Sequence, residues 1–250
     1  MKKTHHDYWK TFYELLTKNY IESTFEPDFC NLNKGECPDF RSDSIGLEIV
    51  SAASESQNAL KSLLRKYWNK NIDEIPVSFL NTLGFFKENL YKDDSKVPLY
   101  IVLSKENGRL LFIKDKDGKY LLFAHIGLLP SDEFNSELIV DMINAKIDKL
   151  NKNYDLMSRN VVGVYIDYPI IPELLEYRNE MANIMKDYID KELLANLEIS
   201  KEKMFDDIYI CFPDVVYKFD PKESVFDFKI LEVEQISAIL NKTNGEIEDL

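Results

Sequence analysis

The feature that most constrains the fold of this chain is an apolar run, Ile45-Gly46-Leu47-Glu48-Ile49-Val50, that carries one acidic residue. The run predicts a buried strand, in which Leu47 and Ile49 point to the face opposite Glu48. A carboxylate in an apolar strand is costly to bury unless a proton, a cation or a metal compensates its charge. The sequence therefore predicts a charged partner for Glu48.

Asp39, in the segment Pro38-Asp39-Phe40, precedes Glu48 by nine residues. Two strands joined by a short turn would place the two acids side by side, because neighbouring strands lie about 4.8 Å apart. A divalent cation relieves the repulsion between adjacent carboxylates, and Mg²⁺ or Mn²⁺ suits such an oxygen-rich site. The alternative is structural: Asp39 begins a turn, and Glu48 faces solvent on an edge strand.

Helices and strands alternate along the 250 residues without a linker-like break. This alternation predicts one domain of the α/β (α+β) class over residues 1–250. Helices are expected over 7–22, 57–68, 77–90, 132–150 and 172–194, and strands over 45–50, 99–103, 109–114, 119–124, 161–166, 208–212, 215–219 and 226–231. The Asp117-Gly118 pair predicts a hairpin turn.

Charge and cysteine content narrow the function classes. The net charge of −13 argues against a protein that coats nucleic acid or anionic membrane over its whole surface. No apolar stretch approaches the roughly 20 residues that span a bilayer, so we expect no membrane partner. Three cysteines, Cys30, Cys37 and Cys211, form no C-x-x-C motif and predict reduced thiols in the cytoplasm.

Pro38-Asp39-Phe40, followed after a short turn by Gly46-Leu47-Glu48-Ile49-Val50, resembles the PD-(D/E)XK nuclease superfamily. Small bacterial proteins of that superfamily share these motifs and carry a later Lys-x-x-Lys helix, which corresponds here to Lys146-Ile147-Asp148-Lys149. The resemblance covers residues 7–168 and implies a restriction-endonuclease-like fold: a central mixed sheet flanked by helices, with 169–250 as a C-terminal elaboration. It also leaves a homodimer open, because nuclease-fold proteins often dimerise.

By this resemblance, Asp39 and Glu48 are the metal ligands, and the carbonyl of Ile49 completes the shell. The superfamily usually has a lysine two residues after the glutamate, where it orients the attacking water and stabilises charge at phosphorus. This chain has Val50 there. Either another cation supplies that charge or the chemistry is lost. Glu36 is a candidate extra acid, although loop glutamates are usually solvated.

The helix expected over 132–150 offers the missing cation. Lys146 falls near the middle of its apolar face, and Lys149 lies at the edge. A lysine so placed snorkels, pairs with a buried acid or reaches a pocket. We expect Lys146 and Lys149 to serve the acid pair, with a snorkelling lysine at the rim of the core as the alternative. Glu14, in the first helix, is expected to be exposed.

Lys61 and Arg65 lie four residues apart on the helix expected over 57–68, so they share one side of it. A basic edge directly after the Glu48 strand would position a phosphate backbone, which predicts nucleic acid as a partner. The alternative is a solvated face. The net charge of −13 predicts weak, salt-sensitive binding in either case.

Two functions follow from these residues. The first is a nuclease that depends on Mg²⁺ or Mn²⁺ and hydrolyses phosphodiester bonds of DNA or RNA. The second is a nuclease-like fold without catalysis, which uses its acidic surface to bind a basic protein, as an immunity-type inhibitor would. Val50 and the net charge favour the second function, whereas the acid pair and Lys146 favour the first.

Overall fold

The computed structural model describes residues 5–52, 66–67, 70–82, 85–93, 99–104, 109–114, 118–126, 136–152, 156–166, 178–198 and 201–248. The chain divides into two compact units, where the sequence predicted a single domain over 1–250. The first unit combines Met1–Ala52 with Asn135–Leu250, and the second is Ala53–Phe134. The described strands of the second unit pair with one another and with none of the first unit's strands. The second unit is therefore an insertion.

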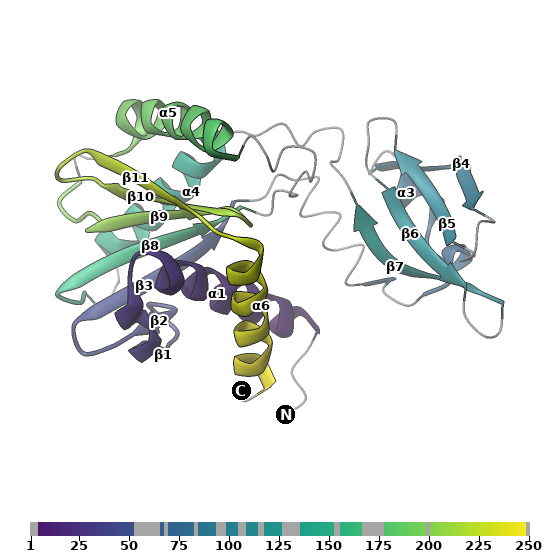
Figure 1. Ribbon diagram of the computed structural model, residues 1–250, viewed down its shortest axis with the longest axis horizontal. Helices are drawn as coiled ribbons and strands as arrows, with labels where there is room; N and C mark the ends of the chain where they lie inside the picture. The colour runs from purple at the N-terminus through teal and green to yellow at the C-terminus, as the bar shows by residue number, and fades with distance from the viewer. Residues whose placement is uncertain are drawn as a thin grey trace. The chain divides into compact units, whose positions relative to one another are not determined.

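In the described part of the first unit, seven strands form one sheet (Figure 1). The strands β3, β8 and β9 are mutually parallel, and the other neighbours are antiparallel. This mixed sheet confirms the α/β class that the sequence predicted. In spatial order the strands are β1 (Asn33–Lys34), β2 (Phe40–Arg41), β3 (Ile45–Ser51), β8 (Arg159–Tyr165), β9 (Asp207–Cys211), β10 (Val215–Asp220) and β11 (Val225–Ile230).

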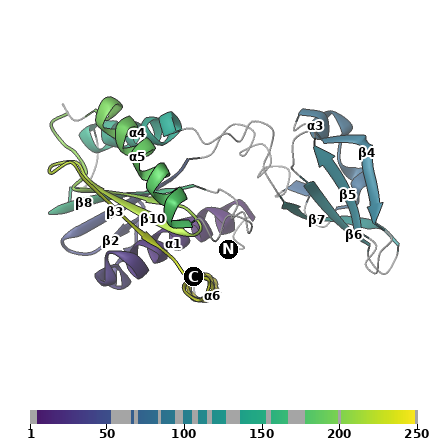
Figure 2. The ribbon, with the colours of Figure 1, turned by 45° about the horizontal axis from the view of Figure 1, so that its top comes forward.

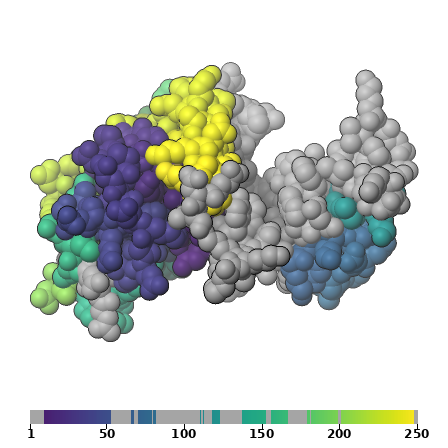
Figure 3. All heavy atoms as spheres, turned by 90° about the horizontal axis from the view of Figure 1, so that it is seen from below, coloured from purple at the N-terminus to yellow at the C-terminus, as the bar shows by residue number. Residues whose placement is uncertain are grey.

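Helices cover both faces of this sheet (Figure 2). On one face lies α1 (His5–Thr24), with α6 (Val233–Glu248) packed against it. The two helices lie side by side at the surface (Figure 3). The opposite face carries α4 (Ser136–Lys152) and α5 (Arg178–Asn196). A short 3-10 helix, Pro27–Asn31, follows α1.

The core under α1 fixes which way the central strands face. Leu47 and Ile49 of β3 are buried there together with Leu16 of α1. At Gly163 of β8 the helix comes so close that an added Cβ would lie 3.0 Å from carbons of both Thr17 and Ile21. The sheet thus has a glycine where α1 crosses it. Leu47, Ile49 and Gly163 face α1, so the residues that alternate with them along β3 and β8 point toward α4.

The second unit contains an antiparallel four-stranded sheet in the order β4-β5-β6-β7 within its described residues. Its turn at Gly118 has φ of 80°, which glycine adopts without strain, and the predicted hairpin there is confirmed. The helix expected over 77–90 ends at Thr82, because Phe85 begins a strand that pairs with β5. In chain order, the described elements of this unit are a 3-10 helix (Ile72–Glu74), α3 (Val77–Thr82), β4 (Phe85–Asp93), β5 (Leu99–Ser104), β6 (Arg109–Lys114) and β7 (Tyr120–Ile126).

None of the helices formed by described residues has the length and apolar character that crossing a membrane requires. Most of the helix expected over 57–68 lies outside the described residues. The three C-terminal strands predicted over 208–212, 215–219 and 226–231 are confirmed as β9, β10 and β11.

Candidate functional site

The β2–β3 hairpin brings Asp39 and Glu48 to opposite positions. Phe40 pairs with Leu47 in the antiparallel register, and the same register carried one residue further sets Asp39 against Glu48. The backbone N–H of Ile49 donates a hydrogen bond of 2.8 Å to Asp39 Oδ2. This bond ties the acid before β2 to the strand that carries Glu48, and it fixes the relative position of the two carboxylates.

Strand alternation turns Glu48 toward α4. Its neighbours Leu47 and Ile49 belong to the core beneath α1. Glu48 lies between them, is only 1% exposed and therefore points to the opposite face, which α4 covers. A carboxylate buried this deeply requires a compensating charge.

Two lysines of α4 supply that charge. Lys146 Nζ and Lys149 Nζ both donate to Glu48 Oε1, at 2.6 and 2.8 Å. Their spacing of three residues places both side chains on one side of the helix. Ile143 and Ile147, four residues apart on α4, are both buried and pack that side of the helix onto the sheet. Of the two uses weighed for Lys146, the structure shows the ion pair with a buried acid.

The two carboxyl groups differ in their pKa. Burial alone would raise the pKa of Glu48, but the hydrogen bonds and charges of Lys146 and Lys149 outweigh burial and hold this pKa below its ordinary value. Burial, followed by the charge of Glu48, raises the pKa of Asp39, and the Ile49 N–H only partly offsets this rise. The site therefore combines a firmly ionised acid with one that protonates more readily, a division typical of paired catalytic carboxylates.

Asp39 and Glu48, with the backbone carbonyl of Ile49, are the groups that would hold a divalent cation. Mg²⁺ and Mn²⁺ accept one or two carboxylates and complete their coordination with water. A bound cation would oppose the rise in the pKa of Asp39, which burial and the neighbouring charge of Glu48 cause. No group of three or more Asp, Glu, His or Cys side chains around a metal position occurs among the described residues.

Val50 lies two residues beyond Glu48 on the same face of β3 and pairs with Val164 of β8. The position where the resembled superfamily usually has its lysine is thus a half-buried, apolar contact between strands. The nearest cations on the Glu48 face are Lys146 and Lys149 from the helix, both hydrogen-bonded to Glu48.

Three other residues considered from the sequence have different outcomes. Glu36 is exposed in the loop before β2, as expected of a solvated side chain. Lys61 and Arg65 lie outside the described residues.

Glu14 was expected to be exposed, and this expectation is wrong. The residue is 8% exposed, and its carboxylate accepts a hydrogen bond from Lys34 Nζ. The helical phase of Glu14 predicts exposure only with respect to the sheet-facing side of α1. The β1 strand also reaches the helix, and Lys34 covers Glu14 from there. The charge of Glu14 contributes to the raised pKa of Asp39, so this acid belongs to the surroundings of the site.

No protein-family model matches the chain, and no solved structure matches it. The chain is similar to part of probable polyketide synthase 25 of Dictyostelium discoideum, at 25% identity over 223 residues. The aligned part covers 80% of this chain and 9% of that protein. The chain thus spans less than a tenth of the length of this curated relative.

Proposed function

We propose that the chain is a divalent-metal-dependent phosphodiesterase of the PD-(D/E)XK type that acts on DNA or RNA. The observation that carries this proposal is the convergence of Lys146 and Lys149 from α4 on Glu48, beside Asp39. Two acids and two cations at one place on the sheet are the groups that phosphoryl transfer to water uses. The arrangement uses helix lysines where the strand offers Val50.

The order of elements supports the same proposal. The segment from α1 through the β2–β3 hairpin to α4 and β8 has the order that the resemblance implies: a helix, the Pro-Asp strand, the Glu strand, a helix and a further strand. The parallel pairing of β3 with β8 follows from the crossover through α4. The second unit is inserted between β3 and α4 and leaves this order intact.

Each described residue of the site has a defined task in this proposal. Asp39 and Glu48 would hold the cation, which would supply an activated water and neutralise charge at phosphorus. Lys146 and Lys149 keep Glu48 ionised. In this proposal their positive charges would also stabilise the negative charge that develops at phosphorus. Asp39, whose pKa is raised, would give up any proton when the cation binds, because a metal ligand must be deprotonated.

A cytoplasmic location belongs to the proposal as well. Cys30, Cys37 and Cys211 are all free thiols, which suits a reducing compartment. Cleavage of nucleic acid in the cytoplasm requires a substrate there, and both RNA and DNA meet that requirement.

Calorimetric titration of Mn²⁺ tests the metal site. We expect the wild-type protein to bind one Mn²⁺, and Asp39→Asn and Glu48→Gln each to lose the binding. Asp187→Asn, which removes an exposed carboxylate on α5, is the matched control and should bind as the wild type does. A folded wild-type protein that binds no Mn²⁺ at millimolar concentration would refute the proposal.

A second candidate function rests on the net charge of −13 and on Val50. A non-catalytic protein of this fold would bind a basic protein through its acidic surface. Its binding of that basic protein would require neither Lys146 nor Lys149. Cleavage assays with labelled DNA and RNA in Mn²⁺ distinguish the two functions. A phosphodiesterase cleaves at least one of them and loses that cleavage in Lys146→Met, whereas the non-catalytic protein cleaves neither.

A further inference from the structure

Arg41 of β2 is an exposed arginine whose side chain has no hydrogen bond, ion pair or ring contact with any described residue. Arg159 shows the contrasting arrangement in this protein, since its guanidinium binds the carboxylates of both Glu26 and Asp207. In a chain with 44 acidic residues, an arginine left without a carboxylate is free to bind an external anion.

Arg41 lies on the same face of the sheet as the candidate site. Phe40 is buried in the core beneath α1, so its neighbours Asp39 and Arg41 both point to the other face. Their positions are two residues apart, about 7 Å along a strand. That separation is of the order of the distance between successive phosphates of a nucleic-acid strand.

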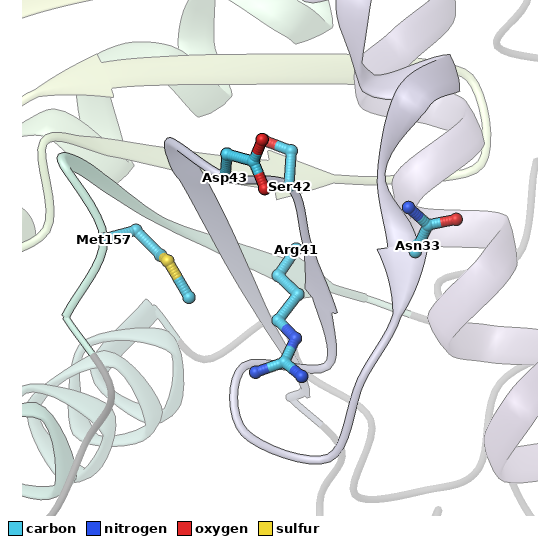
Figure 4. A pocket seen from close by; sticks show the side chains of 5 residues that line it. All are labelled: Asn33, Arg41, Ser42, Asp43 and Met157. Carbon is cyan, nitrogen blue, oxygen red and sulfur yellow. The ribbon is translucent and has the colours of Figure 1, made fainter.

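Arg41 lines a pocket of about 380 Å³ together with Asn33, Ser42, Asp43 and Met157, here called the Arg41 pocket. Figure 4 shows the guanidinium directed away from the turn that carries Ser42 and Asp43, toward the loop that joins β1 and β2. The acid at the turn therefore does not occupy the guanidinium. The same loop leads to Asp39, so the free cation faces the side of the hairpin where the acid pair lies.

The other lining groups also suit a phosphate diester. The oxygen of Ser42 accepts the backbone N–H of Ile45 at 3.1 Å, which leaves the hydroxyl proton available for an external acceptor. The amide of Asn33 has no hydrogen bond with a described residue and adds a second donor. Met157 supplies an apolar wall, because its side chain packs over Gly46, where an added Cβ would lie 3.1 Å from it.

We propose that the Arg41 pocket binds the backbone phosphate adjacent to the one at the candidate site, with Arg41 as the cation and Ser42 and Asn33 as neutral donors. The inference rests on the proposed function and adds to it a contact that positions the bound nucleic-acid strand. The ligand chemistry is a phosphodiester backbone, and DNA and RNA share it. Asp43 is the acid of the pocket and opposes binding, so its removal should strengthen the interaction.

The test measures binding of fluorescein-labelled 12-residue oligonucleotides of DNA and of RNA by anisotropy, in EDTA to prevent hydrolysis. The proteins are the wild type, Arg41→Ala, Arg41→Lys and Asp43→Asn. Lys191→Ala is the control, because it removes one exposed positive charge from α5. We expect Arg41→Ala to bind roughly tenfold more weakly, since a hydrogen-bonded ion pair is lost. The slope of log K against log salt should fall by about 0.7 to 0.9.

Further outcomes sharpen the test. Arg41→Lys should recover most of the affinity, Asp43→Asn should bind more tightly, and Lys191→Ala should match the wild type. In Mn²⁺, Arg41→Ala should raise KM and leave kcat nearly unchanged, because the contact holds the substrate before and during reaction equally. The oligonucleotide that responds identifies DNA or RNA as the source of the phosphate.

The two proposals fail differently. If Arg41→Ala binds and cleaves as the wild type does, the phosphate contact is refuted and the phosphodiesterase stands. If the wild type binds Mn²⁺ nowhere and cleaves neither nucleic acid, the proposed function is refuted and the phosphate contact with it. Arg41 is exposed, so circular dichroism of Arg41→Ala should match that of the wild type and exclude misfolding as a cause.

Discussion

Removing both lysines from Glu48 is the most direct perturbation of the site. The double variant Lys146→Met, Lys149→Met retains the aliphatic stems and deletes both ammonium groups from a carboxylate that is 1% exposed. Breaking a buried ion pair costs about 3–5 kcal/mol. The lysine side chains are 21% and 44% exposed, so solvent screens part of the loss. We expect a destabilisation of about 2–3 kcal/mol at pH 7.

The loss of stability in the double variant should be larger at neutral pH than in mild acid. In the wild type the pKa of Glu48 lies below its ordinary value, so its contribution to stability is present at neutral pH and is lost as the pH falls through the folded-state pKa. In the double variant the lowering effect of the two lysines is gone, and burial raises the pKa of Glu48 above the unfolded value. The variant therefore binds a proton at Glu48 in mild acid, and the difference from the wild type should shrink to about 1 kcal/mol or less at pH 4.

Guanidinium unfolding followed by circular dichroism, in EDTA at pH 7 and pH 4, measures both free energies of unfolding. The matched control is Lys191→Met on α5, an exposed lysine, which should change the free energy by less than about 0.5 kcal/mol at either pH. A difference between wild type and double variant that is equal at the two pH values would refute the reasoning, because Glu48 would not be the group that loses its compensation.

Two further predictions concern the frame around the site. Burial opposes the ionisation of Glu26, but hydrogen bonds from Arg159 and Tyr209 lower the pKa of Glu26 to about 2, so its stabilising effect is present above about pH 4.5 and lost toward pH 2. Arg159→Met should destabilise by about 2–3 kcal/mol at pH 7 and raise the pH midpoint of acid unfolding, as measured by fluorescence. Gly163→Ala should cost about 1–3 kcal/mol in thermal unfolding, because the new Cβ would press on Thr17 and Ile21; an unchanged midpoint would contradict that close contact.

The site shows which parts of a fold local pattern can predict. The alternation around Glu48 and the short turn after Phe40 were enough to predict a hairpin with Asp39 opposite Glu48, because strand period and register fix faces and partners. The helical phase of Lys146 predicted that it would face an apolar surface. The pairing of β3 with β2 and β8 places Glu48 on this surface, although it is 98 residues from Lys146 in the sequence.

Features that depend on distant segments could not be predicted in the same way. The burial of Glu14 depends on Lys34, which reaches it from β1, and α1 alone contains no sign of that cover. The division into two units rests on strand pairing within 53–134. Short polar stretches, 54–58 and 131–136, mark both boundaries in the sequence, but they are no longer than an ordinary loop. Phe85 and its neighbours suit a helix or a strand, and pairing with β5 decided between them.

The place of the insertion bears on the choice between catalysis and binding. Glu48 lies on the strand before the second unit, and Lys146 and Lys149 lie on the helix after it. A connection between a strand and a crossover helix needs only to return the chain to the same sheet, so it accepts a whole unit without a change in the pairing of β3 with β8. The contacts at Glu48 thus persist across a long insertion, although the sheet itself needs neither lysine for its hydrogen bonds. In a chain that used the fold only as an acidic surface, the two lysines would serve stability alone, because they compensate a buried carboxylate. This stabilising role is common to both candidate functions, so Mn²⁺ binding and cleavage of nucleic acid are the measurements that separate the phosphodiesterase from the inhibitor.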